Sequence, residues 1–295
     1  METLEALRRK IDSAKDLRSV VKTMKALAAV NIQHFREAVT SLAEYYRAVE
    51  MGLHVALRSR PEGSRLSEPP KDRRLGAVII GSDQGMVGQF NEQLAHYALD
   101  EMNGFGVGRQ DRAALAVGTR LLGPLEDAGQ PVDDVFPVPV SVAGITPTAQ
   151  DILLRIDEWH SELGLDRVVL FYNRPISSTT YRPHSVQILP VNPRWLQELA
   201  RKPWPGRTLP AFRVEWNRLF SALIRQYLLV SVYRAVVESL ASENQSRVAA
   251  MQAAEKNIED RLHELNRRYH LQRQDSITEE LLDIVGGFEA LGGVA

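Results

Sequence analysis

The 295-residue sequence contains no cysteine, which excludes disulfides, thiolate metal ligands and thiol nucleophiles. It has no run of about 18 apolar residues, so we expect no segment that spans a membrane. Its net charge of −1 gives no general attraction to nucleic acid. The first residues, METLEALRRK, show a helical pattern without the apolar core of a signal peptide. We therefore expect a cytoplasmic protein that binds no nucleic acid.

Glycine and proline, which interrupt helices, are absent from two long stretches. Residues 1–51 contain neither, and none occurs between Pro210 and Gly286. Read as one helix, Ala211 to Val285 would be roughly 110 Å long at 1.5 Å per residue. A compact globule of this chain length has a diameter of only about 50 Å. The C-terminal helix must therefore break or extend beyond the globule.

Both stretches carry an apolar heptad pattern, which we call the seam. Between Leu4 and Ala56, fourteen of sixteen a and d positions are apolar, and between Arg213 and Tyr269 thirteen of seventeen are. Beyond Tyr269 the same register meets only polar residues. Two seams of nearly equal length predict an antiparallel coiled coil formed by the two ends of one chain. A coiled coil between two chains, as in a self-associating scaffold protein, is the alternative.

The middle of the chain alternates strands with helices, which predicts a Rossmann-like α/β domain over residues 72–192 with a largely parallel sheet. This domain is inserted between an N-terminal helix, 1–58, and a C-terminal segment, 211–295. A polar linker precedes it at 60–70, and a proline-rich exit follows at 193–210. We expect strands at 75–80, 113–118, 132–140, 167–172 and 185–191. We expect helices at 91–102, 120–128 and 148–163, the last capped by Thr148.

The loop from Gly81 to Asn91 lies between a strand and a helix, where phosphate sites form. It matches neither G-x-G-x-x-G nor a Walker loop, but a nucleotide-binding α/β enzyme stays open as an alternative, which nucleotide titration would test. No G-x-S-x-G elbow and no metal-ligand spacing occurs. We therefore expect no catalytic residue, no metal and no cofactor. The seven histidines are His34, His54, His96, His160, His184, His263 and His270.

Two features suggest a partner protein. From Arg8 to Lys25 there are seven basic residues and two acidic ones. Arg18 and Lys25 occupy seam positions, where a charge costs coiled-coil stability and calls for a reason. Beyond the seam, apolar residues reappear with nothing in the chain to cover them, which is typical of an interaction surface. This apolar tip comprises Ile277, Leu281, Ile284, Val285 and Phe288.

The sequence resembles the γ subunit of F-type ATP synthases, the central rotor stalk, over nearly its whole length. Five segments carry the resemblance. They are Leu7-Arg-Arg-Lys-Ile-Asp-Ser, Thr23-Met-Lys-Ala-Leu-Ala-Ala, Ser239-Leu-Ala-Ser-Glu-Asn, Arg273-Gln-Asp-Ser-Ile-Thr-Glu-Glu and Ile284-Val-Gly-Gly. The loop Ser82-Asp-Gln-Gly-Met-Val-Gly-Gln-Phe-Asn is similar to a family motif, from which Gln84, Val87 and Gln89 depart. The ending also resembles an alternate bacterial branch that is sometimes associated with sodium transport.

This resemblance implies a non-catalytic rotor subunit, present in one copy per complex. Its coiled coil would lie inside a hexamer of α and β subunits, and its α/β domain would rest on the c-ring beside the ε subunit. Ion flow through the membrane would turn the ring and the stalk, and the β sites would change nucleotide affinity in sequence. The protein would be peripheral, on the cytoplasmic face of the bacterial inner membrane, without a membrane span of its own.

The resemblance also implies which residues contact the catalytic head. Met24 and Lys25 match the positions that meet an acidic lever on β, and the tip would turn in an apolar bearing. A basic patch that meets an acidic segment would account for the charges at seam positions. The full set of expected contacts to the head is Arg18, Met24, Lys25, Arg247, Arg273, Gln274, Thr278 and Glu280, and the resemblance implies polar contacts for Arg247, Gln274, Thr278 and Glu280.

Overall fold

The computed structural model describes residues 3–61, 74–177, 180–208 and 210–292, with side chains up to Gly286 in the last range. Most of the predicted linker at 60–70 lies outside these residues. The chain divides into two units, which are described separately. The terminal unit combines residues 1–27 with 248–295, and the central unit comprises residues 28–247.

Two long helices, α1 (Leu4–Arg58) and α6 (Trp216–Gly292), run antiparallel in both units. In the terminal unit, Leu7 and Ile11 of α1 pack with Leu262 and Leu265 of α6. In the central unit, the Trp216 indole N–H donates to the carbonyl oxygen of Ala56 at 2.7 Å. Every predicted seam position of α1 except Arg18 is buried or half-buried. The expectation of long N- and C-terminal helices around an inserted domain is confirmed.

The structure corrects both predicted ends of the C-terminal helix. Helix α6 begins at Trp216, five residues later than Ala211, and it continues through Gly286 to Gly292. Gly52 lies inside α1, where it faces α6. A Cβ atom there would lie 2.8 Å from Cδ2 of Leu223, so the glycine allows α1 and α6 to approach each other closely.

The central unit contains a five-stranded mixed sheet with the order β3-β2-β1-β4-β5. Its first four strands are parallel, and β5 pairs antiparallel with β4. The strands are β1 (Leu75–Ile80), β2 (Arg112–Val117), β3 (Asp134–Phe136), β4 (Arg167–Pro175) and β5 (Tyr181–Leu189). The Rossmann-like expectation is therefore confirmed, although β3 is far shorter than predicted and β5 begins earlier.

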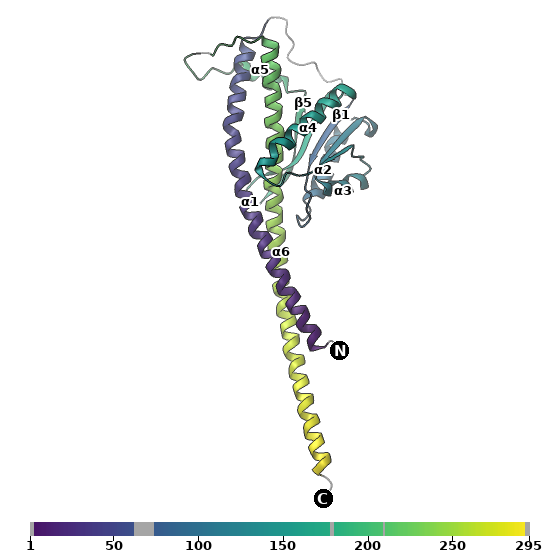
Figure 1. Ribbon diagram of the computed structural model, residues 1–295. Coiled ribbons are helices and arrows are strands. Elements are labelled where there is room, and N and C mark those ends of the chain that lie inside the picture. The colour runs from purple at the N-terminus through teal and green to yellow at the C-terminus, as the bar shows by residue number, and fades with distance from the viewer. Residues whose placement is uncertain (1–2, 62–73, 178–179, 209, 293–295) are drawn as a thin grey trace. The chain divides into compact units, whose positions relative to one another are not determined.

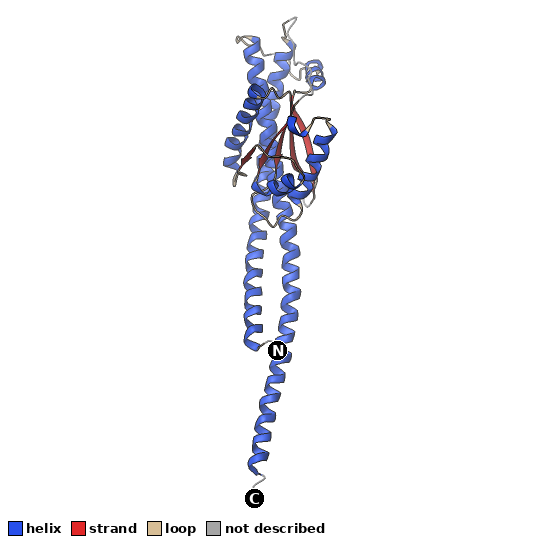
Figure 2. Ribbon diagram, turned by 90° about the vertical axis from the view of Figure 1, so that its right-hand side faces the viewer, coloured by secondary structure: helices blue, strands red, loops and turns tan. Residues whose placement is uncertain are grey.

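Helices cover both faces of this sheet (Figures 1 and 2). Because side chains alternate along a strand, Val78 and Ile80 face a core formed with α4 and α6. Ala77 and Ile79 point the other way, into a core formed with α2 and α3. The shorter helices are α2 (Phe90–Gly104), α3 (Leu122–Asp127), α4 (Val142–Glu162) and α5 (Pro193–Arg201).

Two prolines misled the sequence analysis. Helix α4 begins at Val142 and contains Pro147, so Thr148 does not cap it; its hydroxyl donates instead to the carbonyl oxygen of Gly144 (3.0 Å). The supposed exit at 193–210 contains α5, which starts with Pro193 at its first turn, where a missing N–H costs nothing. The Asn192 side chain caps α5 by accepting from the backbone N–H of Arg194 at 2.9 Å.

Helix α6 contains an 18-residue window with a mean hydropathy of 1.2, which by length and composition alone would suffice to cross a bilayer. That test carries little weight, because core helices of soluble proteins pass it as well. Val230 and Val232 of α6 are buried in cores of the central unit. Only 28% of the window is buried within the chain, so α6 keeps apolar surface that the described residues cover incompletely.

The same helix fills the crevice at the carboxyl ends of β1 and β4, where doubly wound sheets bind their ligands. Every side chain from Ala235 to Arg247 is buried, although most of them are polar. The Ser239 hydroxyl donates to the carbonyl oxygen of Ile80 (2.9 Å), and the Gln245 amide donates to that of Ser177 (3.2 Å). These bonds satisfy backbone groups that end the two strands.

A buried ion pair closes this segment. Arg247 donates to Glu243 at 2.6 Å, and the two residues are only 8% and 5% exposed. Burial raises the pKa of Glu243, whereas Arg247 opposes that rise. The net effect is a raised pKa of Glu243, and the ion pair with Arg247 stabilises the charged form of this buried carboxyl group.

The antiparallel helix pair predicts a specific cross-link. A carbodiimide, which joins an amine directly to a carboxylate, should couple Lys25 to Glu255 because these side chains are ion-paired. Mass spectrometry of a mixture of unlabelled and 15N-labelled chains should find this cross-link within single chains. Exclusive cross-links between labelled and unlabelled chains would instead support the self-associating coiled coil.

Arg247→Ala should destabilise the isolated chain by about 3 kcal/mol, because it leaves a buried carboxylate unpaired. The pKa of Glu243 then rises further above its ordinary 4.5. As pH rises, Glu243 loses its proton in the unfolded chain before it does so in the folded variant. The free energy of unfolding of the variant therefore falls between the unfolded and the folded pKa of this group. Urea unfolding should show a larger deficit at pH 8 than at pH 5.

Arg261→Ala is the matched control, since Arg261 forms a 2.6 Å pair with Glu264 on the same helix but is exposed. It should cost less than about 1 kcal/mol. Equal losses in the free energy of unfolding would show that burial adds nothing to the contribution of the pair of Arg247 and Glu243.

Candidate interaction surfaces

The loop from Gly81 to Asn91, the candidate nucleotide site, is occupied by the chain's own groups. The Asn91 side chain accepts from the backbone N–H of Ser82 (3.0 Å) and donates to its hydroxyl (2.9 Å). From the other side, the Ser246 hydroxyl of α6 donates to the carbonyl oxygen of Val87 at 2.5 Å. Together with the filled crevice, these bonds leave the loop a packing role and argue against the nucleotide-binding enzyme.

Of the three residues that depart from the family motif, Val87 is buried, whereas Gln84 and Gln89 are exposed. Val87 is 3% exposed and takes part in the core, and Gln89 is exposed where α2 begins. Gln84 lines a small cavity of about 120 Å³ together with Arg247. Between them, Met86 has a φ of 62°, which is unusual for a residue other than glycine, and is 62% exposed.

The charges at the seam have partners within the chain. In the terminal unit, Lys25 is ion-paired with Glu255, itself a seam residue, and lowers the pKa of that carboxyl through their hydrogen bond. Arg18 lies 3.8 Å from Glu259. These ion pairs offset the destabilising effect of charge at seam positions, so an acidic partner protein is not needed to explain Arg18 and Lys25. Met24 is half-buried beside Lys25.

A second apolar stripe on α1 was missed by the sequence analysis. Leu17, Val20 and Leu27 are 54%, 55% and 60% exposed, and Met24 continues the same spacing. Each residue precedes a seam residue by one position, so the stripe lies beside the seam rather than in it. A search for a second heptad would have found it.

The apolar tip lies in the last part of α6, beyond the contact of Tyr269 with the core of the terminal unit. Ile277, Leu281, Ile284 and Val285 are 46–67% exposed, and the side chain of Phe288 lies outside the described residues. Leu271 and Leu282 are also exposed, at 55% and 63%, and were missed. Exposed apolar residues that follow one another in this way are typical of an interaction surface.

The polar residues implied as head contacts fall into two groups. Arg273, Gln274, Thr278 and Glu280 are exposed along the tip, and the Thr278 hydroxyl donates to the carbonyl oxygen of Gln274 at 2.9 Å. Arg247 is instead buried in the central unit and paired with Glu243. Its first role in this chain is therefore structural.

No candidate metal site is found in the described part of the chain. The structure brings together no group of three His, Cys, Asp or Glu side chains there. His263 and His270 are exposed on α6, as a solvated helix face predicts. The candidate interaction surfaces among the described residues are therefore the apolar tip of α6 and the second stripe on α1.

Comparison with known proteins identifies the family of this chain. The family model described as ATP synthase, which is that of the F1 γ subunit, matches residues 3–291. A chain from the Euglena gracilis mitochondrial ATP synthase (OSCP/F1/c-ring, rotational state 3) has a TM-score of 0.64 and 19% identity, over 98% of this chain and 94% of that one.

Two further solved structures share the fold. A chain from the Euglena gracilis mitochondrial ATP synthase rotor (rotational state 1) has a TM-score of 0.58 and 18% identity, over 93% and 98% of the two chains. One from the Tetrahymena thermophila mitochondrial ATP synthase central stalk and c-ring has a TM-score of 0.57 and 21% identity, over 80% and 99%. The chain therefore belongs to the ATP synthase γ-subunit family and is a central stalk subunit of an F-type ATP synthase.

Proposed function

We propose that this subunit couples rotation of a membrane c-ring to ATP synthesis or hydrolysis in a hexamer of α and β subunits. The single observation that carries the proposal is the apolar tip of α6. Its leucine, isoleucine and valine side chains are about half exposed or more, and they follow one another along the part of α6 that continues beyond the helix pair. A bearing inside a hexamer would cover this surface without fixing it to one position, as a rotating element requires.

The second stripe on α1 supports a further contact with the head. Leu17, Val20 and Leu27 present apolar surface, and exposed cations such as Arg8 and Lys22 lie along the same helix. An acidic, partly apolar lever on β would match both properties. Met24 and Lys25 lie in this region, with Lys25 contributing through its pair with Glu255.

The remaining parts of the proposal concern the other end of the complex. The α/β domain rests on the c-ring beside the ε subunit, and one copy of the chain serves each complex. The subunit is peripheral, on the cytoplasmic face of a bacterial inner membrane, and belongs to the alternate branch that its ending resembles. It carries no catalytic residue, metal or cofactor, because the chemistry takes place in β.

The test uses purified full-length chain and the hexamer of its α and β subunits. Leu281→Gln combined with Ile284→Gln should weaken binding to the hexamer about tenfold or more, because each apolar side chain stabilises a buried interface by roughly 1.5–3 kcal/mol. The thermal unfolding of the isolated chain should stay unchanged, since both residues are exposed. Binding is measured by titration, and ATP hydrolysis by the reconstituted complex is followed in parallel.

His263→Gln with His270→Gln is the control, because both histidines are exposed on α6 outside the tip. It should leave binding and hydrolysis unchanged. The proposal fails if the chain does not bind the hexamer, or if the tip variant binds it as tightly as the histidine control does.

A further inference from the structure

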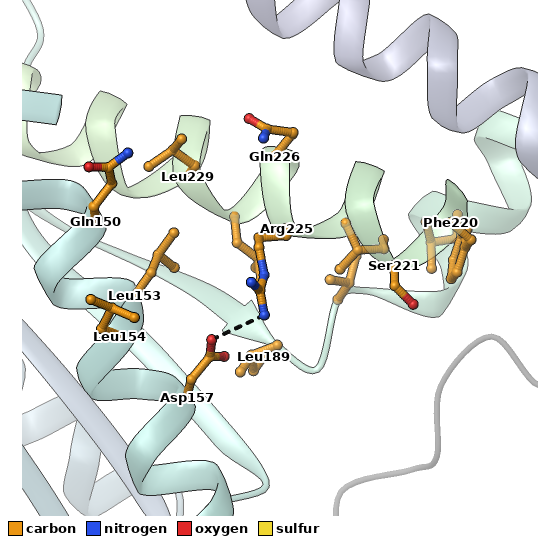
Figure 3. A pocket seen from close by; sticks show the side chains of 14 residues that line it. Gln150, Leu153, Leu154, Asp157, Leu189, Phe220, Ser221, Arg225, Gln226 and Leu229 are labelled. Atoms are coloured by element: carbon orange, nitrogen blue, oxygen red, sulfur yellow. Dashed lines mark ion pairs between the residues drawn. The ribbon is translucent and has the colours of Figure 1, made fainter. Parts of the chain in front are cut away.

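A cavity of about 630 Å³ lies in the central unit between α4, α6 and the connection from β5 to α5. Nine of its fourteen lining residues are apolar, and Figure 3 shows Leu153 and Leu154 of α4 opposite α6. Its volume falls within the range of about 300–1,000 Å³ that is usual for small-molecule sites. Neither the apolar tip of α6 nor the second stripe on α1 includes any of its lining residues.

The polar groups at this cavity are few and lie at its rim. Arg225 of α6 reaches across to Asp157 of α4, with a distance of 3.5 Å between guanidinium and carboxylate (Figure 3). Both side chains remain mostly exposed, at 76% and 61%. A guanidinium has five donors, so Arg225 can hold Asp157 and a second anion together.

The rim carries more positive than negative charge. Among the lining residues, Arg225 is the only base and Asp157 the only acid. Arg218, Ser221 and Arg225 follow one face of α6 at intervals of three and four residues, so the exposed Arg218 adds a second cation beside the cavity. The apolar interior and the cationic rim together suit a ligand with an apolar tail and an anionic head.

We propose that this cavity binds a long-chain carboxylate, with its tail between α4 and α6 and its head on Arg225, Ser221 and Arg218. A partner helix is the weaker candidate, because a stable protein interface buries about 800 Å² on each partner. The volume of about 630 Å³ is instead that of a small-molecule site. The uncovered apolar surface of α6 supplies the driving force, since only 28% of its most apolar window is buried within the chain.

Calorimetric titration of the full-length chain with laurate, below its micellar concentration, tests this site. Dodecyltrimethylammonium has the same tail with a positive head and is the matched ligand. Laurate should bind with saturation and raise the unfolding temperature, whereas the cation should bind at least tenfold more weakly. Arg225→Gln should weaken laurate about tenfold, and Asp157→Asn should strengthen it, because the rim becomes more positive.

Two further variants separate the cavity from general surfactant binding. Leu154→Trp places a larger side chain at a lining position that is already 61% exposed, so it should block laurate without disturbing the core. Leu163→Trp follows α4 outside the cavity and should leave laurate binding unchanged. Equal binding of the two ligands, no saturable binding of laurate, or equal effects of the two tryptophan variants would overturn the proposal.

Discussion

The crevice at the carboxyl ends of β1 and β4 is filled by the chain's own helix, and the rest of the central unit depends on this. In doubly wound sheets that crevice receives a ligand. Here Ser239 and Gln245 bind the backbone where the two strands end, and Ser246 holds the loop that follows β1. The sheet therefore holds α6 in place, and α6 occupies the crevice in which an enzyme of this fold would bind its ligand.

One helix therefore meets three different requirements along its length. Its first part packs with α1, α5 and the sheet through apolar residues such as Val230. The middle part is buried and mostly polar; Arg247 pairs with Glu243 there, and Arg234 pairs with the buried Glu238. Its last part pairs with α1 through Leu262 and Leu265 and then continues alone, with an apolar surface exposed. Such a helix can transmit force only if its ends bind different partners, which is what a central stalk subunit needs.

The sequence predicted the helix pair and the sheet well because both rest on local periodicity. The heptads marked the seam, and the buried run Leu75–Ile80 matched β1 residue for residue. The errors arose where a single residue type was given too much weight. Thr148 was predicted to cap a helix that begins earlier, at Val142, and the proline-rich exit from Pro193 contains α5. Gly286 suggested an end that α6 passes.

The interaction surfaces were predicted less completely, since burial and partner choice depend on tertiary contacts. Arg247 matched a family position for head contacts, yet its neighbours bury it. Arg18 and Lys25 suggested an external acidic partner, whereas Glu259 and Glu255 supply one from 230 or more residues away. The cavity beside Arg225 combines α4, the end of β5 and α6, which no local pattern brings together.

Rotation of this chain inside its hexamer tests the central claim most directly. The sequence has no cysteine and Val140 is 91% exposed, so Val140→Cys provides a single attachment point for a bead on the α/β domain. With the hexamer fixed to a surface and ATP supplied, the bead should turn repeatedly in one direction while hydrolysis continues. A bead that only fluctuates while the hexamer hydrolyses ATP at its full rate would contradict the account.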